Sequence, residues 1–313
     1  MRVGTVTKTA SALLILIVLL NFCACTQNKP GAVLHNEGDV GYISCIADMK
    51  NVDISSEQAF IYELDSDSFI YLKGEGLVVY PASTLKLLTA LYALSLMPAD
   101  TLITAGDEIE MIAKDSSVAY IKKGHVLTLE MLIQGMMIPS GNDAAYVVAA
   151  AVGRLILGDE AAKAKDAVRV FVDGMNTYAV NLGTCGSHFV SPDGYELESN
   201  YSTVEDMTII SKCAYENDII MKYANMPFAE VVYASGQTNI WTNTNQMLIP
   251  ESKYYNEDIS GLKTGSLGKG NYNLICTLEH NGKKYIIGVF AAKSADTRFE
   301  DMQTLIDSLD VSV

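Results

Sequence analysis

The spacing of apolar residues changes along the chain and divides it into strand-forming and helix-forming regions. Near the beginning, short runs rich in β-branched and aromatic residues are separated by Asp, Ser and Gly, which predicts strands. These runs are residues 42–49, 58–64 and 69–72. In the middle, apolar residues recur every three or four positions, as they do on one face of a helix. The helices predicted in this way are residues 84–96, 129–137, 142–155, 160–182 and 204–215.

The strand pattern returns in the last third of the chain. The predicted strands there are residues 230–234, 272–278 and 285–291. Asn281 and Gly282, between the last two, are typical of a tight hairpin turn. Ser202 and Glu205 form a capping-box pattern at the start of the last central helix. A final helix is predicted over residues 297–309.

Strands, then helices, then strands and a helix indicate an α+β fold. We expect an α/β/α sandwich, in which an antiparallel β-sheet is flanked by helices. The central region, about residues 87–228, is predicted to be an all-helical subdomain inserted into the sheet. Residues 41–313 would form this one domain.

The first 25 residues have the pattern of a signal peptide. Arg2 and Lys8 carry positive charge, and residues 10–20 are almost wholly apolar. This apolar run is shorter than the roughly 20 residues that a membrane-spanning helix needs. We therefore expect an exported protein.

The end of this leader resembles a bacterial lipobox. Ala24 precedes Cys25, as the pattern requires, whereas Phe22 stands where Leu is usual. We predict lipid attachment at Cys25, with residues 26–40 as a tether. The alternative is an uncleaved leader that serves as the anchor. Both place the domain on the outer face of the cytoplasmic membrane.

The charge and the remaining cysteines exclude several classes of function. The formal net charge is -15, which argues against nucleic acid as a partner. Outside the leader, four cysteines are scattered singly, so we expect buried thiols and neither a zinc site nor a disulfide framework. The four histidines match no metal spacing. We expect no metal and no cofactor.

A first candidate motif for chemistry lies at Ser83 and Lys86, just after Pro81 at the start of a predicted helix. A spacing of three places both side chains on one helical face. A lysine whose pKa is lowered can take the proton of a serine and make it a nucleophile. The same spacing occurs at Ser260 and Ser266, so on its own the motif is weak.

Two further motifs follow along the chain. Ser140 and Asn142 lie in a tight loop between two predicted helices, where either could also be a helix cap. The predicted strand around Lys263 and Thr264 could bind a carboxylate. Gly265 after them would let a substrate backbone approach without a Cβ in the way.

Together, S-x-x-K, S-G-N and K-T-G stand in the order found in β-lactamases and penicillin-binding proteins. The chain resembles the D-alanyl-D-alanine carboxypeptidase family of low-molecular-mass penicillin-binding proteins. Further stretches that are similar to this family extend the resemblance over about residues 41–310. They are residues 124–132, 171–183, 192–194 and 202–207. The resemblance implies a β-lactamase-like or DD-peptidase-like fold.

The resemblance also implies roles for the motif residues. Ser83 would be the nucleophile, Lys86 its base, and Ser140 and Asn142 the proton relay and the orienting group. The substrate-binding residues would be Lys263, Thr264, Gly265 and Ser266, with the N–H groups of Ser83 and Ser266 as the oxyanion hole. The implied partners are a peptidoglycan stem peptide ending in D-Ala-D-Ala and β-lactam antibiotics as covalent inhibitors.

Two departures from the family pattern stand out. Many members have His where this chain has Ser266, which bears on substrate preference. Many also continue into a β-rich domain and an amphipathic anchoring helix. A lipid on Cys25 would replace that anchor.

Two alternative functions remain open from the sequence. A β-lactamase would need an additional carboxylate for deacylation, for which Glu196 or Glu198 could serve. A cell-wall-binding lipoprotein without activity could keep the same fold.

Overall fold

The computed structural model describes residues 52–268 and 270–310. The predicted leader, Cys25, the tether at residues 26–40 and the predicted strand at residues 42–49 lie outside the described residues. Within the described part, no helix combines the length and apolar character that a membrane crossing requires.

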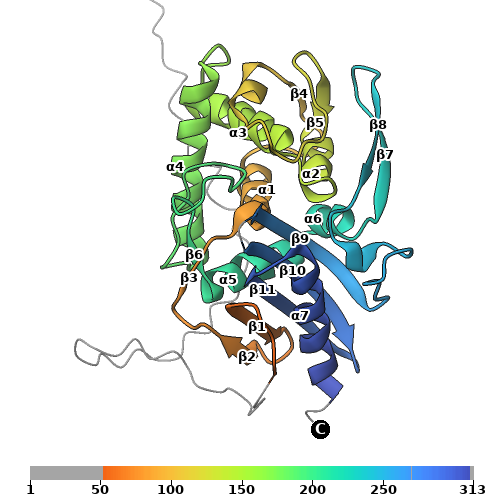
Figure 1. Cartoon of the computed structure of the whole chain (residues 1–313). Helices are drawn as coiled ribbons and strands as arrows, with labels where there is room; N and C mark the ends of the chain where they lie inside the picture. The colour runs from red at the N-terminus through yellow and green to blue at the C-terminus, as the bar shows by residue number, and fades with distance from the viewer. Residues whose placement is uncertain (1–51, 269, 311–313) are drawn as a thin grey trace, which may run out of the picture. The chain divides into compact units, whose positions relative to one another are not determined.

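A five-stranded antiparallel sheet forms the centre of the domain (Figure 1). Its order is β2-β1-β11-β10-β9, so β1 pairs with β11 although the two come from opposite ends of the described chain. The strands are β1 Gln58–Glu63, β2 Ser68–Lys73, β9 Ile259–Gly268, β10 Asn271–His280 and β11 Lys283–Ala292. Asn281 and Gly282 join β10 to β11 with φ angles of 52° and 76°. This confirms the predicted hairpin turn.

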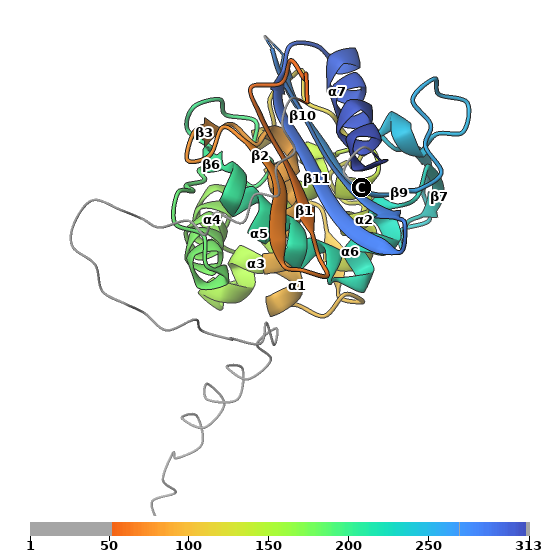
Figure 2. The ribbon, with the colours of Figure 1, turned by 90° about the horizontal axis from the view of Figure 1, so that it is seen from below.

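Both faces of the sheet are covered, which explains why β1 is buried along its whole length. Ala59 and Ile61 belong to a core beneath α7 (Ala295–Asp307), whereas Phe60 belongs to the core on the opposite face. Gly288, opposite Phe60, leaves room for its ring, because a Cβ there would lie 2.2 Å from it. Figure 2 shows α7 on one side of the sheet and the helices α5 (Val204–Tyr215) and α6 (Asp218–Ala224) on the other. The predicted sandwich of helices around an antiparallel sheet is confirmed.

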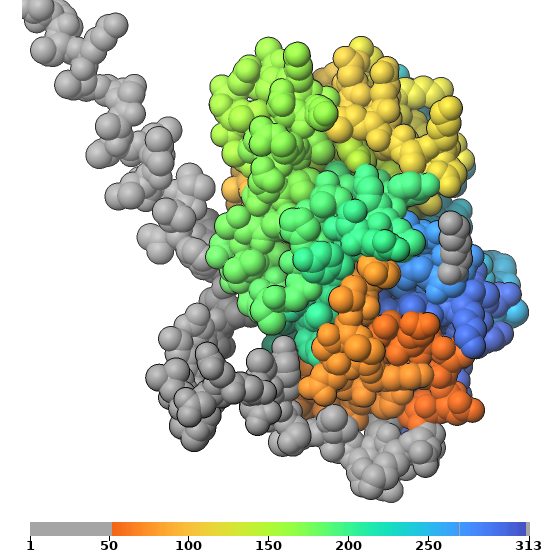
Figure 3. Space-filling view, turned by 60° about the vertical axis from the view of Figure 1, so that its left-hand side comes forward, coloured from red at the N-terminus to blue at the C-terminus, as the bar shows by residue number. Residues whose placement is uncertain are grey.

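The helices of the central region pack on the sheet face opposite α7 and on one another. They are α1 Lys86–Leu96, α2 Leu129–Met137, α3 Asn142–Leu157, α4 Ala164–Leu182, α5 Val204–Tyr215 and α6 Asp218–Ala224. Figure 3 shows α4 (green) beside the segment that leads into α5 (teal). The predicted bounds of α2 and α5 are confirmed. The predicted start of α4 is four residues early, because Gly158 ends α3 in a left-handed conformation and a turn follows.

The central region is not all-helical, as the sequence had suggested. It contains the two-stranded pair β4 Leu102–Thr104 and β5 Val126–Thr128, and the strand β6 Ser202–Thr203, which pairs with β3 Val78–Val79. A further hairpin joins β7 Phe228–Val232 to β8 Thr238–Thr242. The predicted strand at residues 230–234 therefore begins two residues earlier. Strands of two or three residues are too short for an apolar alternation to reveal them.

Two smaller expectations need correction. The cap of α5 is Thr203, which accepts a 3.2 Å hydrogen bond from the N–H of Asp206, because Ser202 belongs to β6. Cys213 and Cys276 are buried as expected, whereas Cys185 is exposed in the loop after α4.

Candidate active site

The buried side chain of Lys86 makes three hydrogen bonds at the start of α1. Its Nζ donates to Ser83 Oγ and to Asn142 Oδ1, each at 2.7 Å, and to the main-chain oxygen of Asp193 at 3.2 Å. Ser83 lies in the single turn η1 (Ala82–Leu85) that leads into α1, and it is partly exposed. A serine that solvent can reach therefore contacts an amine that solvent cannot reach.

The turn before Ser83 is held in an unusual conformation between two glycines. Ala82 is fully buried with a φ of 51°, in the left-handed region that few non-glycine residues adopt. A Cβ on Gly194 would lie 2.1 Å from the carbonyl oxygen of Ala82, and one on Gly265 would lie 2.6 Å from that of Pro81. We expected Gly265 to leave room for a substrate. In the structure, the backbone of the turn at Pro81 and Ser83 occupies the space beside Gly265, so β9 packs against Ser83.

The loop between α2 and α3 supplies the second predicted motif. Ser140 is buried with a φ of 61°, and Asn142 is buried at the first position of α3. Asn142 accepts from Lys86 and donates through Nδ2 to Ser116 Oγ at 2.9 Å. Ser116, from the loop after residue 111, is a site residue that no sequence motif indicated. No hydrogen bond of the described residues joins the Ser140 hydroxyl to Ser83 or Lys86, so its relay role stays a prediction.

The third motif lies on β9. Lys263 is buried and donates to the main-chain oxygen of Thr264 at 3.1 Å. The Thr264 hydroxyl shares a 2.6 Å hydrogen bond with that of Thr244, whose N–H donates to Ile138 in the loop before Ser140. The structure thus brings all three motifs together. None of the ion pairs found among the described residues includes Lys263.

A second cation beside this strand comes from α7. Arg298 Nη1 donates to the Gly265 carbonyl at 3.2 Å and to Ser266 Oγ at 2.8 Å. Arg298 is buried, and its Nε has no hydrogen-bond partner among the described residues. Ser266 is exposed. The guanidinium and Lys263 therefore form a cationic group that opens to solvent at Ser266 and suits an anionic ligand. Sequence reasoning missed Arg298, because nothing around it in the final helix distinguishes it.

Burial controls the protonation of both lysines. It lowers the pKa of Lys86 to about 8, while the carboxylates of Asp193 and Asp143 act in the opposite direction. The pKa of Lys263 lies well below its usual value, first because of burial and then because of repulsion from Lys86 and Arg298. Burial therefore favours the neutral form of Lys86, and repulsion between the two amines adds to the lowering of the pKa of Lys263.

Two buried carboxylates fix the backbone around Lys86. Asp193 Oδ1 accepts from Ser191 Oγ at 2.8 Å and from the Tyr195 N–H at 3.1 Å, which shapes the loop whose carbonyl binds Lys86. Asp143 accepts 2.8 Å bonds from the N–H groups of Ala119 and Ile121. Burial raises the pKa of both carboxyl groups. Their role is therefore to position loops, with some influence on the charge of Lys86.

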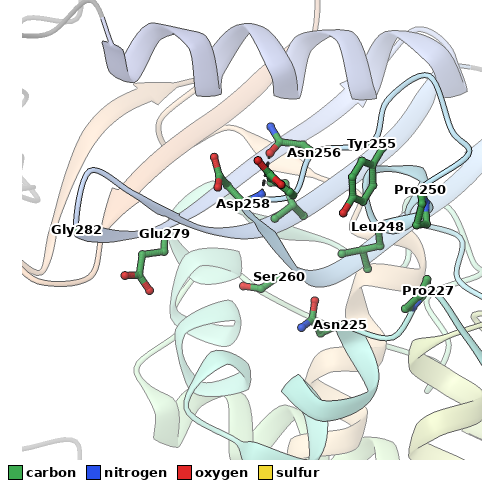
Figure 4. A pocket seen from close by; sticks show the side chains of 12 residues that line it. Asn225, Pro227, Leu248, Pro250, Tyr255, Asn256, Asp258, Ser260, Glu279 and Gly282 are labelled. Carbon is green, nitrogen blue, oxygen red and sulfur yellow. Dashed lines mark hydrogen bonds between the residues drawn. The ribbon is translucent and has the colours of Figure 1, made fainter.

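A separate hollow of about 710 Å³ lies beside the first residues of β9 (Figure 4). Its lining includes Tyr255 and the acidic side chains of Glu257, Asp258 and Glu279, and none of the predicted site residues. An acidic lining does not suit the anionic ligand that the cations near Ser83 favour. In the part of the chain that the structure describes, no group of three or more His, Cys, Asp or Glu side chains could hold a metal ion.

Comparison with known proteins gives one consistent result. Residues 46–294 match the model of a peptidase family, S11, described as D-alanyl-D-alanine carboxypeptidase. The chain is 32% identical over 247 residues to a D-alanyl-D-alanine carboxypeptidase of Streptomyces sp. (strain K15), a match that covers 76% of this chain and 81% of that enzyme. It is 25% identical over 257 residues to the D-alanyl-D-alanine carboxypeptidase DacF of Bacillus subtilis, covering 80% of this chain and 61% of DacF.

The fold comparison agrees. The crystal structure of the Streptomyces K15 DD-transpeptidase superposes with a TM-score of 0.74 at 28% identity, covering 83% of this chain and 98% of that one. Penicillin-binding protein D2 of Listeria monocytogenes, in its ampicillin-bound form, superposes with a TM-score of 0.66 at 24% identity. This second likeness shows a shared fold.

Proposed function

The chain belongs to the D-alanyl-D-alanine carboxypeptidase family, and from this membership we propose that it removes the terminal D-alanine from peptidoglycan stem peptides as a serine peptidase. The observation that carries the proposal is the 2.7 Å contact between Lys86 Nζ and Ser83 Oγ, with Lys86 buried and its pKa lowered. An exposed lysine would remain protonated at neutral pH and could not accept a proton.

In the first half of the proposed cycle, Ser83 Oγ attacks the carbonyl carbon between the last two D-alanines while Lys86 takes its proton. The N–H groups of Ser83 and Ser266 would stabilise the oxyanion. Their proximity is supported by Gly265, where a Cβ would lie 3.3 Å from the Ser83 nitrogen. The C–N bond then breaks, the proton passes to the departing amine, and an ester to Ser83 remains.

In the second half, water attacks the ester and the shortened peptide leaves. The proton of the water returns to Ser83, which restores the enzyme. A β-lactam would follow the first half only: Ser83 opens the ring, but the leaving amine stays attached to the acyl group. Covalent inhibition by penicillins follows from this difference.

The free carboxylate of the terminal D-alanine is the anion that the cationic group beside β9 would bind. Arg298 provides charge, and the Lys263 amine and the Thr264 hydroxyl provide donors. Burial and the neighbouring cations lower the pKa of Lys263, and a bound carboxylate would favour its charged form. Specificity for a chain end over an internal peptide bond would come from this recognition, because an internal residue lacks the carboxylate.

We further propose that the enzyme is exported and held at the outer face of the cytoplasmic membrane by a lipid on Cys25, with residues 41–313 as its catalytic domain. The leader pattern supports this anchor, and a peptidoglycan substrate requires a location outside the membrane. Replacing Cys25 with Ser should release the protein from the membrane fraction. Full retention of this variant would instead favour an uncleaved leader as the anchor.

The direct test of activity is release of D-alanine from a pentapeptide ending in D-Ala-D-Ala. Wild-type protein should release it, and the Ser83→Ala variant should not. Hydrolysis of penicillin, measured in parallel, should be much slower than D-alanine release. Rapid penicillin turnover would identify a β-lactamase, and absence of both activities would identify a binding protein that only keeps the fold. Glu196 and Glu198, the carboxylates considered for β-lactamase action, are exposed.

A further inference from the structure

Two loops that are far apart in the sequence meet beside the candidate active site. One follows residue 111 and carries Asp115; the other leads from α4 toward β6 and carries Tyr195. The Tyr195 hydroxyl donates a hydrogen bond to Asp115 Oδ1 at 2.5 Å. Within residues 52–268 and 270–310, this is the one hydrogen bond found that joins the two loops directly.

Each of these loops also holds part of the hydrogen-bond network of Lys86. Ser116, next to Asp115, accepts from Asn142 Nδ2 at 2.9 Å, and Asn142 in turn accepts from Lys86. The carbonyl of Asp193, two residues before Tyr195, accepts from Lys86 directly at 3.2 Å. The contact between Asp115 and Tyr195 therefore closes a ring of contacts that begins and ends at Lys86.

We propose that Asp115 and Tyr195 form a clasp that positions Lys86 for proton transfer with Ser83. The inference rests on the proposed function and adds two positioning residues to it. Lys86 has a long, flexible side chain, so its amine stays in place only if its acceptors stay in place. Neither Asp115 nor Tyr195 accepts a hydrogen bond from Lys86. Both act by holding the loops that carry them.

The clasp contributes little to the stability of the fold, because the contact is exposed to solvent. Its effect on the reaction is larger, because a displacement of about 1 Å in a reacting group can cost about 100-fold in rate. Loss of the clasp is therefore expected to leave the domain folded and to slow proton transfer.

By holding the two loops together, the clasp would also limit the entry of water to the buried Lys86. The charged groups that face Lys86 are the carboxylates of Asp193 and Asp143 and the cation of Lys263. Burial is the cause that lowers the pKa of Lys86, and the two carboxylates act against it. If the loops separate and water enters, the pKa of Lys86 rises. The neutral fraction of Lys86 at neutral pH then falls.

The chain offers a matched control for this contact. Tyr254 donates through its hydroxyl to Asp296 Oδ1 at 2.7 Å, also at an exposed position, and neither residue contacts Lys86 or its acceptors. Tyr254→Phe removes the same hydroxyl from the same type of pair. Tyr195→Phe removes the donor of the clasp, and Asp115→Leu removes the acceptor with little change in side-chain size.

The experiment measures acylation of the full-length variants by a chromogenic cephalosporin in a stopped-flow instrument, with saturation curves at several pH values. We expect Tyr195→Phe and Asp115→Leu to lower the acylation rate constant about tenfold or more at neutral pH, with the apparent dissociation constant nearly unchanged. The pH below which the acylation rate constant falls should be higher in these variants than in wild type. The double variant should be no slower than either single variant, because both remove one contact. Tyr254→Phe should behave as wild type.

Three results would overturn the clasp. In the first, the clasp variants are acylated at the same rate as Tyr254→Phe. In the second, only the apparent dissociation constant changes. In the third, the clasp variants are acylated faster than wild type, which would mean that the contact covers the site as a lid. Thermal unfolding of each variant shows whether a loss of rate reflects a loss of folded protein. If wild type itself is not acylated, the proposed function fails. If wild type is acylated, Ser83→Ala is not, and the clasp variants match the control, only the clasp fails.

Discussion

The Nζ of Lys86 lies 2.7 Å from the Oγ of Ser83, one turn away along the same segment of chain. This contact joins a buried amine to a partly exposed hydroxyl. The spacing of three residues provides the proximity, and the surrounding core provides the burial that lowers the pKa of the lysine. The contact between Ser83 and Lys86 therefore depends on both local and tertiary structure.

The rate of acylation by penicillin should rise with pH through about 8. Below this value Lys86 is mostly protonated and cannot accept the proton of Ser83; above it the amine is mostly neutral. Stopped-flow measurements between about pH 6 and pH 10 test this. An acylation rate that rises with a midpoint near 10.5, the usual pKa of lysine, would show that burial does not lower the pKa of Lys86.

Removal of either cation beside β9 should weaken binding of the substrate carboxylate. Lys263→Ala and Arg298→Ala are each expected to reduce kcat/KM for the pentapeptide about 10- to 100-fold, which corresponds to loss of a charge-assisted hydrogen bond of about 1.5 to 3 kcal/mol. Arg169→Ala serves as a control, because Arg169 forms an exposed ion pair on α4.

The same variants can be compared on a pentapeptide whose terminal carboxyl group is amidated. On this substrate the kcat/KM of wild type should exceed that of Lys263→Ala and Arg298→Ala by much less, because the substrate carries no carboxylate for the cations to bind. An unchanged difference between wild type and the variants would mean that the cations act on something other than the carboxylate.

Gly265→Ala should disturb the turn that carries Ser83. The added Cβ would lie 2.6 Å from the Pro81 carbonyl oxygen, so β9 and the turn must separate. We expect a loss of about 1 to 3 kcal/mol in the free energy of unfolding and much weaker labelling by fluorescent penicillin. Urea unfolding and gel fluorescence measure the two effects.

Gly158→Ala is the control for this substitution. Gly158 has a φ of 63° and nothing within 4 Å of the added Cβ, so only the strain of a left-handed alanine remains, about 1 kcal/mol. Its penicillin labelling should equal that of wild type. Equal labelling of Gly265→Ala and Gly158→Ala would show that the turn tolerates the displacement.

Local features of the site and the fold could be predicted from the sequence, because nearby residues determine them. The helix at residues 129–137, the turn at Asn281 and Gly282, and the pairing of Ser83 with Lys86 are of this kind. Asn142 could also be placed in the site, because three motifs in a fixed order indicated a family.

Features that depend on tertiary packing could not be predicted. Arg298 reaches Ser266 from α7, and Ser116 reaches Asn142 from an irregular loop, and neither follows from spacing. The close approach of Gly265 to the turn at Pro81 depends on how the strand packs. The extent to which Lys86 is buried, which lowers its pKa, is a further feature of this kind, because burial is a property of the folded core.

We propose that Ser83 is the residue that becomes acylated. Incubation with benzylpenicillin, proteolysis and mass spectrometry of the peptides locate the adduct directly. We predict a single penicilloyl group on Ser83 in wild type and no adduct in Ser83→Ala. An adduct on another residue, or equal acylation of Ser83→Ala, would show that Ser83 is not the nucleophile.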